Sequence, residues 1–209
     1  MKFTTLPVLL LAAGSTLWGA PKMEDITSAR TFTMNYTLSQ ETVKAQFALG
    51  NPEGKLLPAK RAVRFDFDPL STTNYGLKVG ADRASVRYDG LKNFPLQGGT
   101  IEMTIKNCDW EYQQKKVHMF LSTAASDLTM YIYKHSDDGI GVYTRNAQTK
   151  KSLFLRTMPK DWKSNSIHHL AYTWDGAGNS VLYLDGRMVA KGYCVLPETP
   201  VKNFTIGPA

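Results

Sequence analysis

From residue 31 onward, the chain consists of short runs rich in Val, Ile, Thr, Tyr and Phe, separated by clusters of Gly, Asn, Asp or Pro. Apolar and polar positions alternate along several of these runs, and this period of two residues is typical of half-buried β-strands. Leu128, Met130 and Ile132, for example, share one face of a predicted strand, and Tyr131 and Tyr133 share the other. Because helix signals are almost absent, the pattern predicts an all-β protein. The expected strands are 32–38, 43–49, 62–67, 84–88, 100–106, 117–122, 128–134, 139–144, 152–156, 168–174, 180–184, 188–191 and 204–206.

Two turns connect the most strongly patterned strands. Asp185 and Gly186 separate two apolar runs. Asp-Gly is the strongest short-range hairpin signal, because a type I′ turn needs positive φ at both central residues. The stretch 175–179 reads DGAGN and has the composition of a second turn. We therefore expect three consecutive antiparallel strands between residues 168 and 191.

The composition fits a folded chain that depends on a hydrophobic core. Of its 209 residues, 43% are hydrophobic and 21% are charged, which is too apolar for a disordered protein. Two cysteines cannot staple a chain of this length, so a core must hold the fold together. Cys108 and Cys194 are either bridged or buried as free thiols. No apolar run reaches the roughly 20 residues that a membrane-spanning helix needs.

The first segment, 1–20, predicts a secretory signal. Lys2 supplies a positive start, 6–13 form an apolar stretch, and 14–20 are mostly small residues suited to cleavage. Trp18 leaves the position of the cut open. The alternative is a buried N-terminal helix or strand. We expect export, and therefore a secreted or cell-surface location.

The predicted meander also carries a family pattern. Residues 168–175 read HHLAYTWD, 181–190 read VLYLDGRMVA, and 99–106 read GTIEMTIK. Together they resemble the laminin G-like, concanavalin A-like jelly-roll domain of secreted proteins, over about 84–207. The resemblance implies a two-sheet antiparallel jelly-roll sandwich.

The chain departs from the family pattern at its C-terminal end. After 203–209, the family continues into a further strand that is absent here. Either the chain is a fragment, or an N-terminal strand such as 32–38 fills the position. We expect 1–20 to be a signal peptide, 21–83 a strand-rich part of the same sandwich, and 84–209 the jelly-roll core.

A search for catalytic motifs assigns no catalytic residue. The E-x-D-x-x-E strand of jelly-roll β-glucanases does not occur, nor does a G-x-S-x-G elbow, a P-loop or a dinucleotide fingerprint. The nearest carboxylate pairs are Asp66 with Asp68 and Asp109 with Glu111. A polysaccharide-cleaving enzyme that uses Asp66 or Asp109 is kept as a third interpretation.

Aromatic and planar polar side chains in loops and at strand ends are candidates for sugar binding. Protein-bound sugars are held by aromatic faces and by planar polar groups, and loops carry ligand specificity in such folds. The candidates are Trp110, Tyr112, Tyr133, His135 and Trp162. The alternative for Trp162 is a structural cap on the sandwich.

The charge pattern narrows the class of partner. The formal net charge is +7 at pH 7, and no nucleic-acid recognition motif occurs. We therefore favour an acidic extracellular glycan over nucleic acid, and an inert solvated rim over either. The basic clusters are Lys115-Lys116, Lys150-Lys151 and Arg156 with Lys160 and Lys163.

The resemblance also implies a possible calcium ion, held by oxygen ligands from loops. Candidate ligands are Asp127, Asp137, Asp138 and Asp175. Adjacent His168 and His169 point to opposite faces of one strand, so they are expected to be structural and not to share a metal. The sequence as a whole predicts a non-catalytic carbohydrate-binding or adhesion module, with a protein-interaction or structural module as the alternative.

Overall fold

The structure, a computed structural model, describes residues 85–106 and 111–208 continuously. Before them it describes only 32–33, 37–38, 42–44, 47–48, 50–51, 53–57, 64–67 and 75–78. All of the regular secondary structure in these residues is β-strand, and the two main antiparallel sheets form a jelly-roll-like sandwich, which confirms the predicted fold class. The predicted signal segment lies outside the described residues.

The large sheet has nine strands in the order β13-β12-β11-β10-β17-β8-β5-β3-β2. Its strands are β2 (Thr37–Leu38), β3 (Thr42–Lys44), β5 (Glu53–Leu57), β8 (Ser85–Asp89), β10 (His118–Ala124), β11 (Leu128–Lys134), β12 (Ile140–Asn146), β13 (Lys151–Thr157) and β17 (Asn203–Ile206). The small sheet has four strands in the order β16-β15-β14-β9. Its strands are β9 (Gly98–Lys106), β14 (Ile167–Asp175), β15 (Asn179–Leu184) and β16 (Arg187–Tyr193). Two further pairs are β1 (Phe32–Thr33) with β4 (Phe47–Ala48) and β6 (Arg64–Phe67) with β7 (Tyr75–Lys78).

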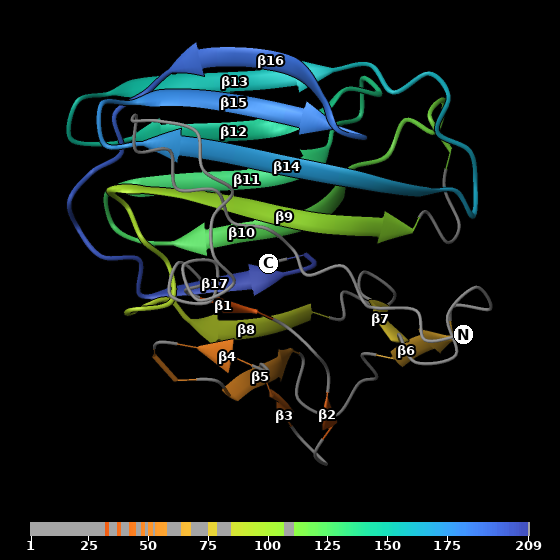
Figure 1. Cartoon of the computed structure of the whole chain (residues 1–209), viewed down its shortest axis with the longest axis horizontal. Coiled ribbons are helices and arrows are strands. Elements are labelled where there is room, and N and C mark those ends of the chain that lie inside the picture. The colour runs from red at the N-terminus through yellow and green to blue at the C-terminus, as the bar shows by residue number, and fades with distance from the viewer. Residues whose placement is uncertain are drawn as a thin grey trace, which may run out of the picture.

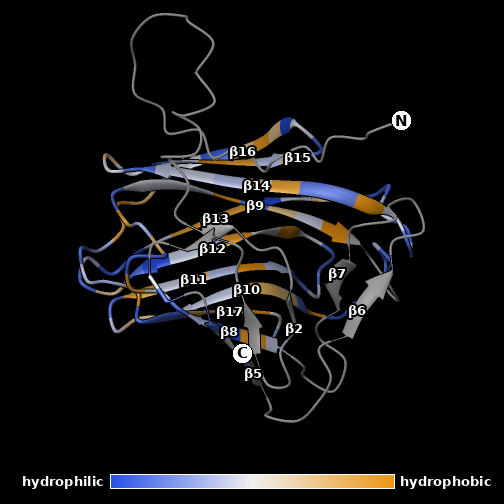
Figure 2. Ribbon diagram, turned by 60° about the horizontal axis from the view of Figure 1, so that its bottom comes forward, coloured by the Kyte–Doolittle hydropathy of each residue, from blue (hydrophilic) through white to orange (hydrophobic). Residues whose placement is uncertain are grey.

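The small sheet lies across the large one, and the core fills the space between them (Figure 1). Leu128, Met130 and Ile132 on β11 are at most 1% exposed, as their alternation predicted. Tyr172 and Trp174 on β14 face them from the small sheet, with ring centroids 5.5 Å apart. Figure 2 shows apolar and polar segments following one another along the strands, because each strand turns only one face to the core.

The predicted meander is confirmed. β14 pairs with β15 and β15 pairs with β16, all antiparallel. Asp185 and Gly186 have φ angles of 49° and 75°, the positive values that a two-residue hairpin of this type requires. Gly178, in the second turn, has a φ of 97°.

The N-terminal part joins the large sheet through a strand that the pattern did not predict. The neighbour of β8 is β5, whose sequence EGKLL has little strand propensity. The expected strand 32–38 contributes instead the two short strands β1 and β2. Pairing with β8 is therefore decided by backbone hydrogen bonds to a distant segment and not by local composition.

No helix long and apolar enough to cross a membrane occurs in the part of the chain that the structure describes.

Candidate functional site

Three connections gather at one end of the sandwich, the end where β9, β11 and β13 finish and β14 begins (Figure 1). They are 111–117, 135–139 and 158–166, and we call them the loop rim. The backbone N–H of Tyr112 donates to the carbonyl of Trp162 at 3.0 Å, which ties the first connection to the third. The rim thus brings together predicted site residues that are far apart in the sequence, namely Tyr112, His135 and Trp162.

Trp162 packs into the sandwich. Its side chain is 1% exposed, and its ring stacks on the imidazole of His168 with centroids 4.1 Å apart and planes 8° apart. A ring covered in this way offers no open face to a sugar. The geometry fits the alternative interpretation, in which Trp162 caps the sandwich and anchors the rim.

His168 is part of a hydrogen-bonded chain that has the order of a catalytic triad. Its Nδ1 lies 2.8 Å from Asp185 Oδ2, and its Nε2 lies 2.8 Å from Ser166 Oγ. The Ser166 hydroxyl, however, lies 2.6 Å from the carbonyl of Lys163, which can only accept its single proton. The Ser166 hydroxyl therefore accepts a hydrogen bond from His168 Nε2. The hydrogen bonds of Ser166, His168 and Asp185 therefore connect the rim to the β15–β16 turn.

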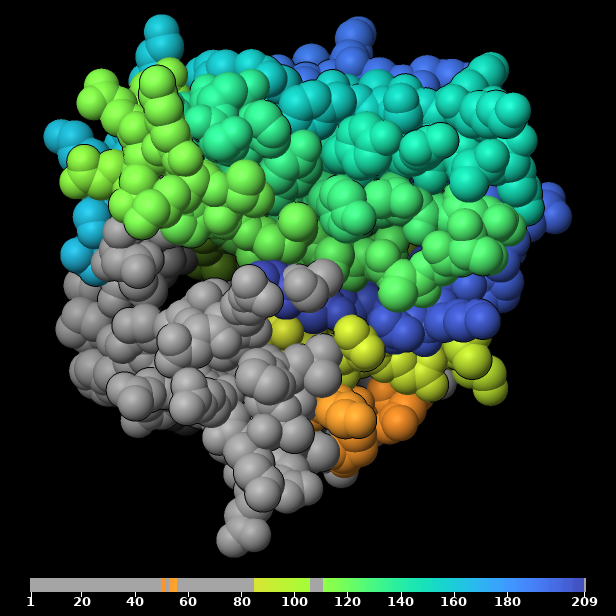
Figure 3. Space-filling view, turned by 180° about the vertical axis from the view of Figure 1, so that it is seen from behind, coloured from red at the N-terminus to blue at the C-terminus, as the bar shows by residue number. Residues whose placement is uncertain are grey.

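Aromatic side chains cover the outer face of the large sheet. Cross-strand register places Tyr131 beside Tyr143 and Tyr143 beside Phe154, and Tyr133 lies two residues further along β11. The rings of Tyr131 and Tyr143 stack with centroids 6.3 Å apart, and those of Tyr133 and Phe154 stack at 5.9 Å. We call these four residues the aromatic face. Figure 3 views this side, where the green to cyan strands β10 to β13 form a broad open surface.

Gly141 leaves room for the ring of Tyr133 to stack on Phe154. It lies between Tyr133 and Arg156 across the strands, so the ring of Tyr133 reaches over it to Phe154. A Cβ at Gly141 would lie 2.1 Å from the carbonyl oxygen of Leu155. Only glycine fits there without a shift of the backbone.

Tyr133 and His135 connect the aromatic face to the loop rim. Their rings meet edge to face with centroids 5.8 Å apart. Partial burial raises the pKa of the Tyr133 phenol, and the nearby carboxylate of Asp137 raises it further. The Tyr133 hydroxyl therefore keeps its proton at neutral pH and can both donate and accept hydrogen bonds.

The turn after β11 is held by charge. Asp137 pairs with the guanidinium of Arg156, which also lies 5.6 Å from the ring centre of Phe154. Desolvation opposes ionisation of Asp137, but the N–H of Gly139, the Arg156 guanidinium and His135 outweigh it and hold the pKa of this carboxyl below its usual value. Arg156 is thereby fixed at the border between the aromatic face and the rim.

Exposed cations surround the rim. Lys115, Lys116, Lys160 and Lys163 are all exposed and lie in its first and third connections. Lys150 precedes β13 and Lys151 is its first residue, so this pair lies at the opposite end of the strand from Arg156. Two of the three basic clusters thus share one end of the sandwich.

Tyr131, Tyr143 and Phe154 were not among the predicted site residues. The alternation of 128–134 did place Tyr131 beside Tyr133 on the outer face. The pairing of Tyr143 and Phe154 with them depends on register between strands, which the alternation within each strand leaves open.

Several predicted residues lie outside the described residues, namely Asp68, Cys108, Asp109 and Trp110. Of Asp66, only its position in β6 is described. Cys194 is buried with a free thiol.

The candidate calcium ligands are occupied by other groups and do not converge. Asp127 accepts hydrogen bonds from Thr199 and Gln148, and Asp175 accepts them from Asn179. Asp137 and Asp138 are paired with Arg156 and Lys134, respectively. Among the described residues, no group of three or more His, Cys, Asp or Glu side chains could hold a metal ion. This donor set does not fit a calcium site.

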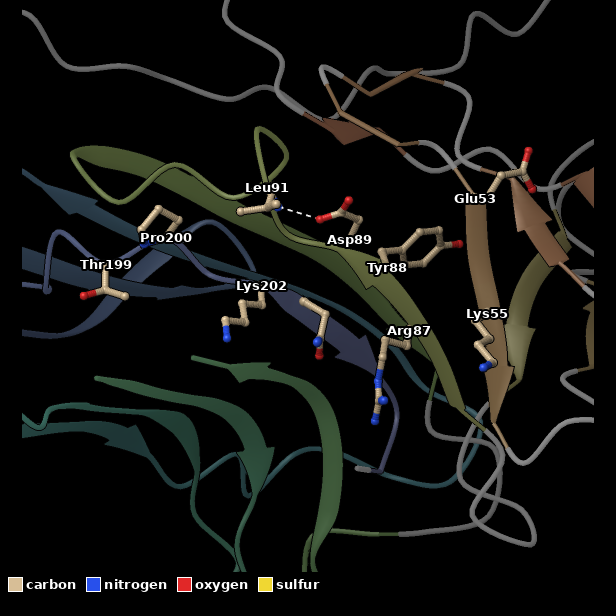
Figure 4. A pocket seen from close by; sticks show the side chains of 10 residues that line it. Glu53, Lys55, Arg87, Tyr88, Asp89, Leu91, Thr199, Pro200 and Lys202 are labelled. Atoms are coloured by element: carbon tan, nitrogen blue, oxygen red, sulfur yellow. Dashed lines mark hydrogen bonds between the residues drawn. The ribbon is translucent and has the colours of Figure 1, made fainter. Parts of the chain in front are cut away.

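A hollow of about 640 Å³ lies near the other end of the sandwich, beside β5, β8 and β17. Lys55, Arg87 and Lys202 extend their charged groups toward the same side of it, and Leu91 is 48% exposed (Figure 4). Glu53 and Asp89 add negative charge to its lining. The hollow therefore combines both signs of charge with an apolar contact.

Glu102, on the outer face of the small sheet, destabilises the folded state in a pH-dependent way. Desolvation raises the pKa of this carboxyl above 4.5, although His169 nearby lowers it in part. Between 4.5 and the higher folded value the unfolded chain ionises first, so stability falls as pH rises. We expect Glu102→Gln to be more stable than the wild type at neutral pH, and the gain to vanish below 4.5. Urea unfolding from pH 4 to 8 measures this difference, with exposed Glu198→Gln as the control.

If the gain in stability of Glu102→Gln grew as pH fell, the assigned upward direction of the Glu102 pKa shift would be wrong.

Taken together, the fold defines the chain as a jelly-roll-like antiparallel β-sandwich protein. No family model matches the chain, and no curated protein matches it. Solved structures do match: the receptor-binding domain of a botulinum neurotoxin C/D mosaic serotype has a TM-score of 0.67 and 12% identity, over 87% of this chain and 43% of that chain. The chain thus spans less than half of the structures it matches.

Two further similar structures come from the same group. A structure of botulinum neurotoxin type C, which interacts with two ganglioside molecules, has a TM-score of 0.63 and 14% identity, over 89% of this chain and 44% of that chain. The binding domain of botulinum neurotoxin DC in complex with rat synaptotagmin II has a TM-score of 0.59 and 12% identity, over 87% and 44%. At these identities the similarity shows the fold alone.

Proposed function

We propose that this chain is a non-catalytic carbohydrate-binding module of a secreted or cell-surface protein, built as a laminin G-like sandwich. In this proposal 1–20 are a signal peptide, 21–83 belong to the sandwich, and 84–209 are its core. One observation carries the proposal: Tyr112, Tyr133 and His135 gather with exposed cations at one end of the fold.

The proposed ligand is an acidic extracellular glycan. The rings of the aromatic face stack on one another, so they present mainly edges and tyrosine hydroxyls to a ligand. Phe154 is the more open ring, with 37% of its surface exposed. Sugar C–H groups would pack against Phe154, hydroxyls would bond to Tyr133, and carboxylate or sulfate groups would meet the lysines of the rim.

The similar structures support this proposal by analogy. One of them interacts with gangliosides, and another is a binding domain in complex with a sialyl glycan, SialylT. Both ligands contain sugar groups. They favour an extracellular glycan partner here, although the residues of this chain have to define its own site.

Changing Tyr133 to alanine should remove most of the glycan binding. A central aromatic contact contributes about 2 kcal/mol or more, so retention should fall by roughly 30-fold. The measurement is the affinity of the purified full chain for an array of sialylated, uronic, sulfated and neutral glycans. Tyr183→Ala, on the small sheet, is the matched control. Unchanged retention by Tyr133→Ala would remove this site.

The hollow beside β8 supports a second candidate, a protein-interaction module. Exposed Leu91 between charges of both signs is typical of the centre and rim of a protein interface. One similar structure is a complex with the protein synaptotagmin II. A chain that retained no glycan but bound a specific protein would favour this candidate over the first.

A further inference from the structure

The side chain of Lys134 ends in a cage of oxygen atoms beneath the loop rim. Lys134 is the last residue of β11, and it points to the same side as Met130 and Ile132. Its side chain is 0% exposed. A buried ammonium is strongly destabilising unless several polar atoms compensate for its lost hydration.

Among the described residues, four oxygen atoms of two rim connections lie close to the ammonium. Lys134 Nζ donates to the carbonyl of Gln114 at 2.6 Å and to Asp138 Oδ1 at 2.9 Å. It also lies 3.4 Å from the carbonyl oxygens of Lys116 and His135. One cation thus links the connection before β10 to the turn after β11.

These donors are of the type that calcium takes in proteins, carbonyl and carboxylate oxygens, but calcium needs 6–8 of them at 2.3–2.6 Å. Here the Asp138 carboxylate and three carbonyls lie 2.6 to 3.4 Å from an ammonium. The family resemblance implies a possible calcium ion, whereas the cage contains a cation that belongs to the chain.

We propose that the Lys134 ammonium is the resident cation of this cage and holds the loop rim in shape without calcium. The role concerns the shape of the rim, so it goes beyond the proposed function and holds whichever ligand the rim binds. Lys134 is a positioning residue in this account, because its ammonium is enclosed and contacts no ligand.

The backbone around Asp138 agrees with this role. Asp138 has a φ of 70°, in the left-handed region that few residues other than Gly, Asn and Asp adopt. The turn is closed by the N–H of His135, which donates to Gly139 at 2.7 Å, and by the N–H of Asp138, which donates to His135 at 3.1 Å. Its carboxylate is only 14% exposed, and the ion pair to Lys134 compensates for that burial.

The test compares the full chain with Lys134→Met, which keeps the apolar length and removes the charge. Its melting temperature should fall by roughly 10 °C, because removing one partner leaves the other buried charge unpaired. Lys191→Met, on exposed β16, is the matched control and should melt like the wild type. Equal melting of Lys134→Met and the wild type would overturn the proposal.

A second measurement separates a cation role from ordinary packing. Lys134→Ala leaves room at the cage, so millimolar ethylammonium chloride should raise its melting temperature by binding the folded state. The wild type should melt equally in calcium and in EDTA, and this comparison needs no variant. Absence of any rescue by ethylammonium, or a higher melting temperature of the wild type in calcium than in EDTA, would overturn the proposal. Glycan retention plays no part in these readouts, so they fail or succeed separately from the proposed function.

Discussion

Replacing Trp162 with alanine is expected to destabilise the protein by about 3–5 kcal/mol, the usual cost of deleting a buried tryptophan. The ring is 1% exposed and stacks on His168, and its backbone carbonyl accepts the hydrogen bond from Tyr112. Its removal would leave a cavity where two connections of the rim meet. Chemical denaturation of the purified chain measures the loss.

Trp162→Phe is the conservative control for this prediction. Phenylalanine keeps a ring that can stack on His168, so much of the stability and the glycan retention should remain. The opposite result would make Trp162 a binding residue: full stability of Trp162→Ala combined with loss of glycan retention. The pair of variants thus separates a cap from a contact residue.

The second large effect is expected at Gly141. An alanine Cβ there would lie 2.1 Å from the carbonyl oxygen of Leu155 and 2.9 Å from the Cα of Arg156. Both of these atoms belong to the backbone of β13, so β12 and β13 would have to move apart. Overpacking of this kind costs about 1–3 kcal/mol or more. Urea unfolding should show that loss, and the Tyr133–Phe154 stack would be disturbed with it.

Gly186→Ala is the matched comparison for Gly141→Ala. Gly186 has a φ of 75° but no heavy atom within 4 Å of the added Cβ, so only backbone strain opposes the change. A single residue in the left-handed region costs about 1–2 kcal/mol. Glycan retention should survive at Gly186 and fall at Gly141. A larger loss of stability at Gly186 than at Gly141 would contradict the steric argument.

Both effects arise where strands and loops meet, and they have one physical origin. The aromatic face depends on the spacing of β11, β12 and β13, and the loop rim depends on contacts under it. Trp162 is buried beneath the third connection, and the ammonium of Lys134 holds the first two connections together. We therefore expect variants at these positions to alter ligand retention even though neither side chain touches a ligand.

The amino-acid sequence by itself determined the local features. The alternation of Leu128, Met130 and Ile132 predicted which face of β11 is buried, because successive side chains of a strand point to opposite sides. Asp185 and Gly186 predicted the hairpin, because few residue pairs adopt positive φ twice in succession. The order of strands in the β14–β16 meander followed from these short connections.

Only the tertiary structure decided what distant segments do together. No local pattern identifies which residues meet in three features of the fold. These are the pairing of β5 with β8, the row from Tyr131 to Phe154, and the cage around Lys134. In the sequence, Lys134 is a polar residue at the end of the predicted strand 128–134. Its ammonium is nevertheless buried, because the fold brings Gln114 and Asp138 to it. Period and turn chemistry act over a few residues, whereas register and burial depend on which chain segments meet.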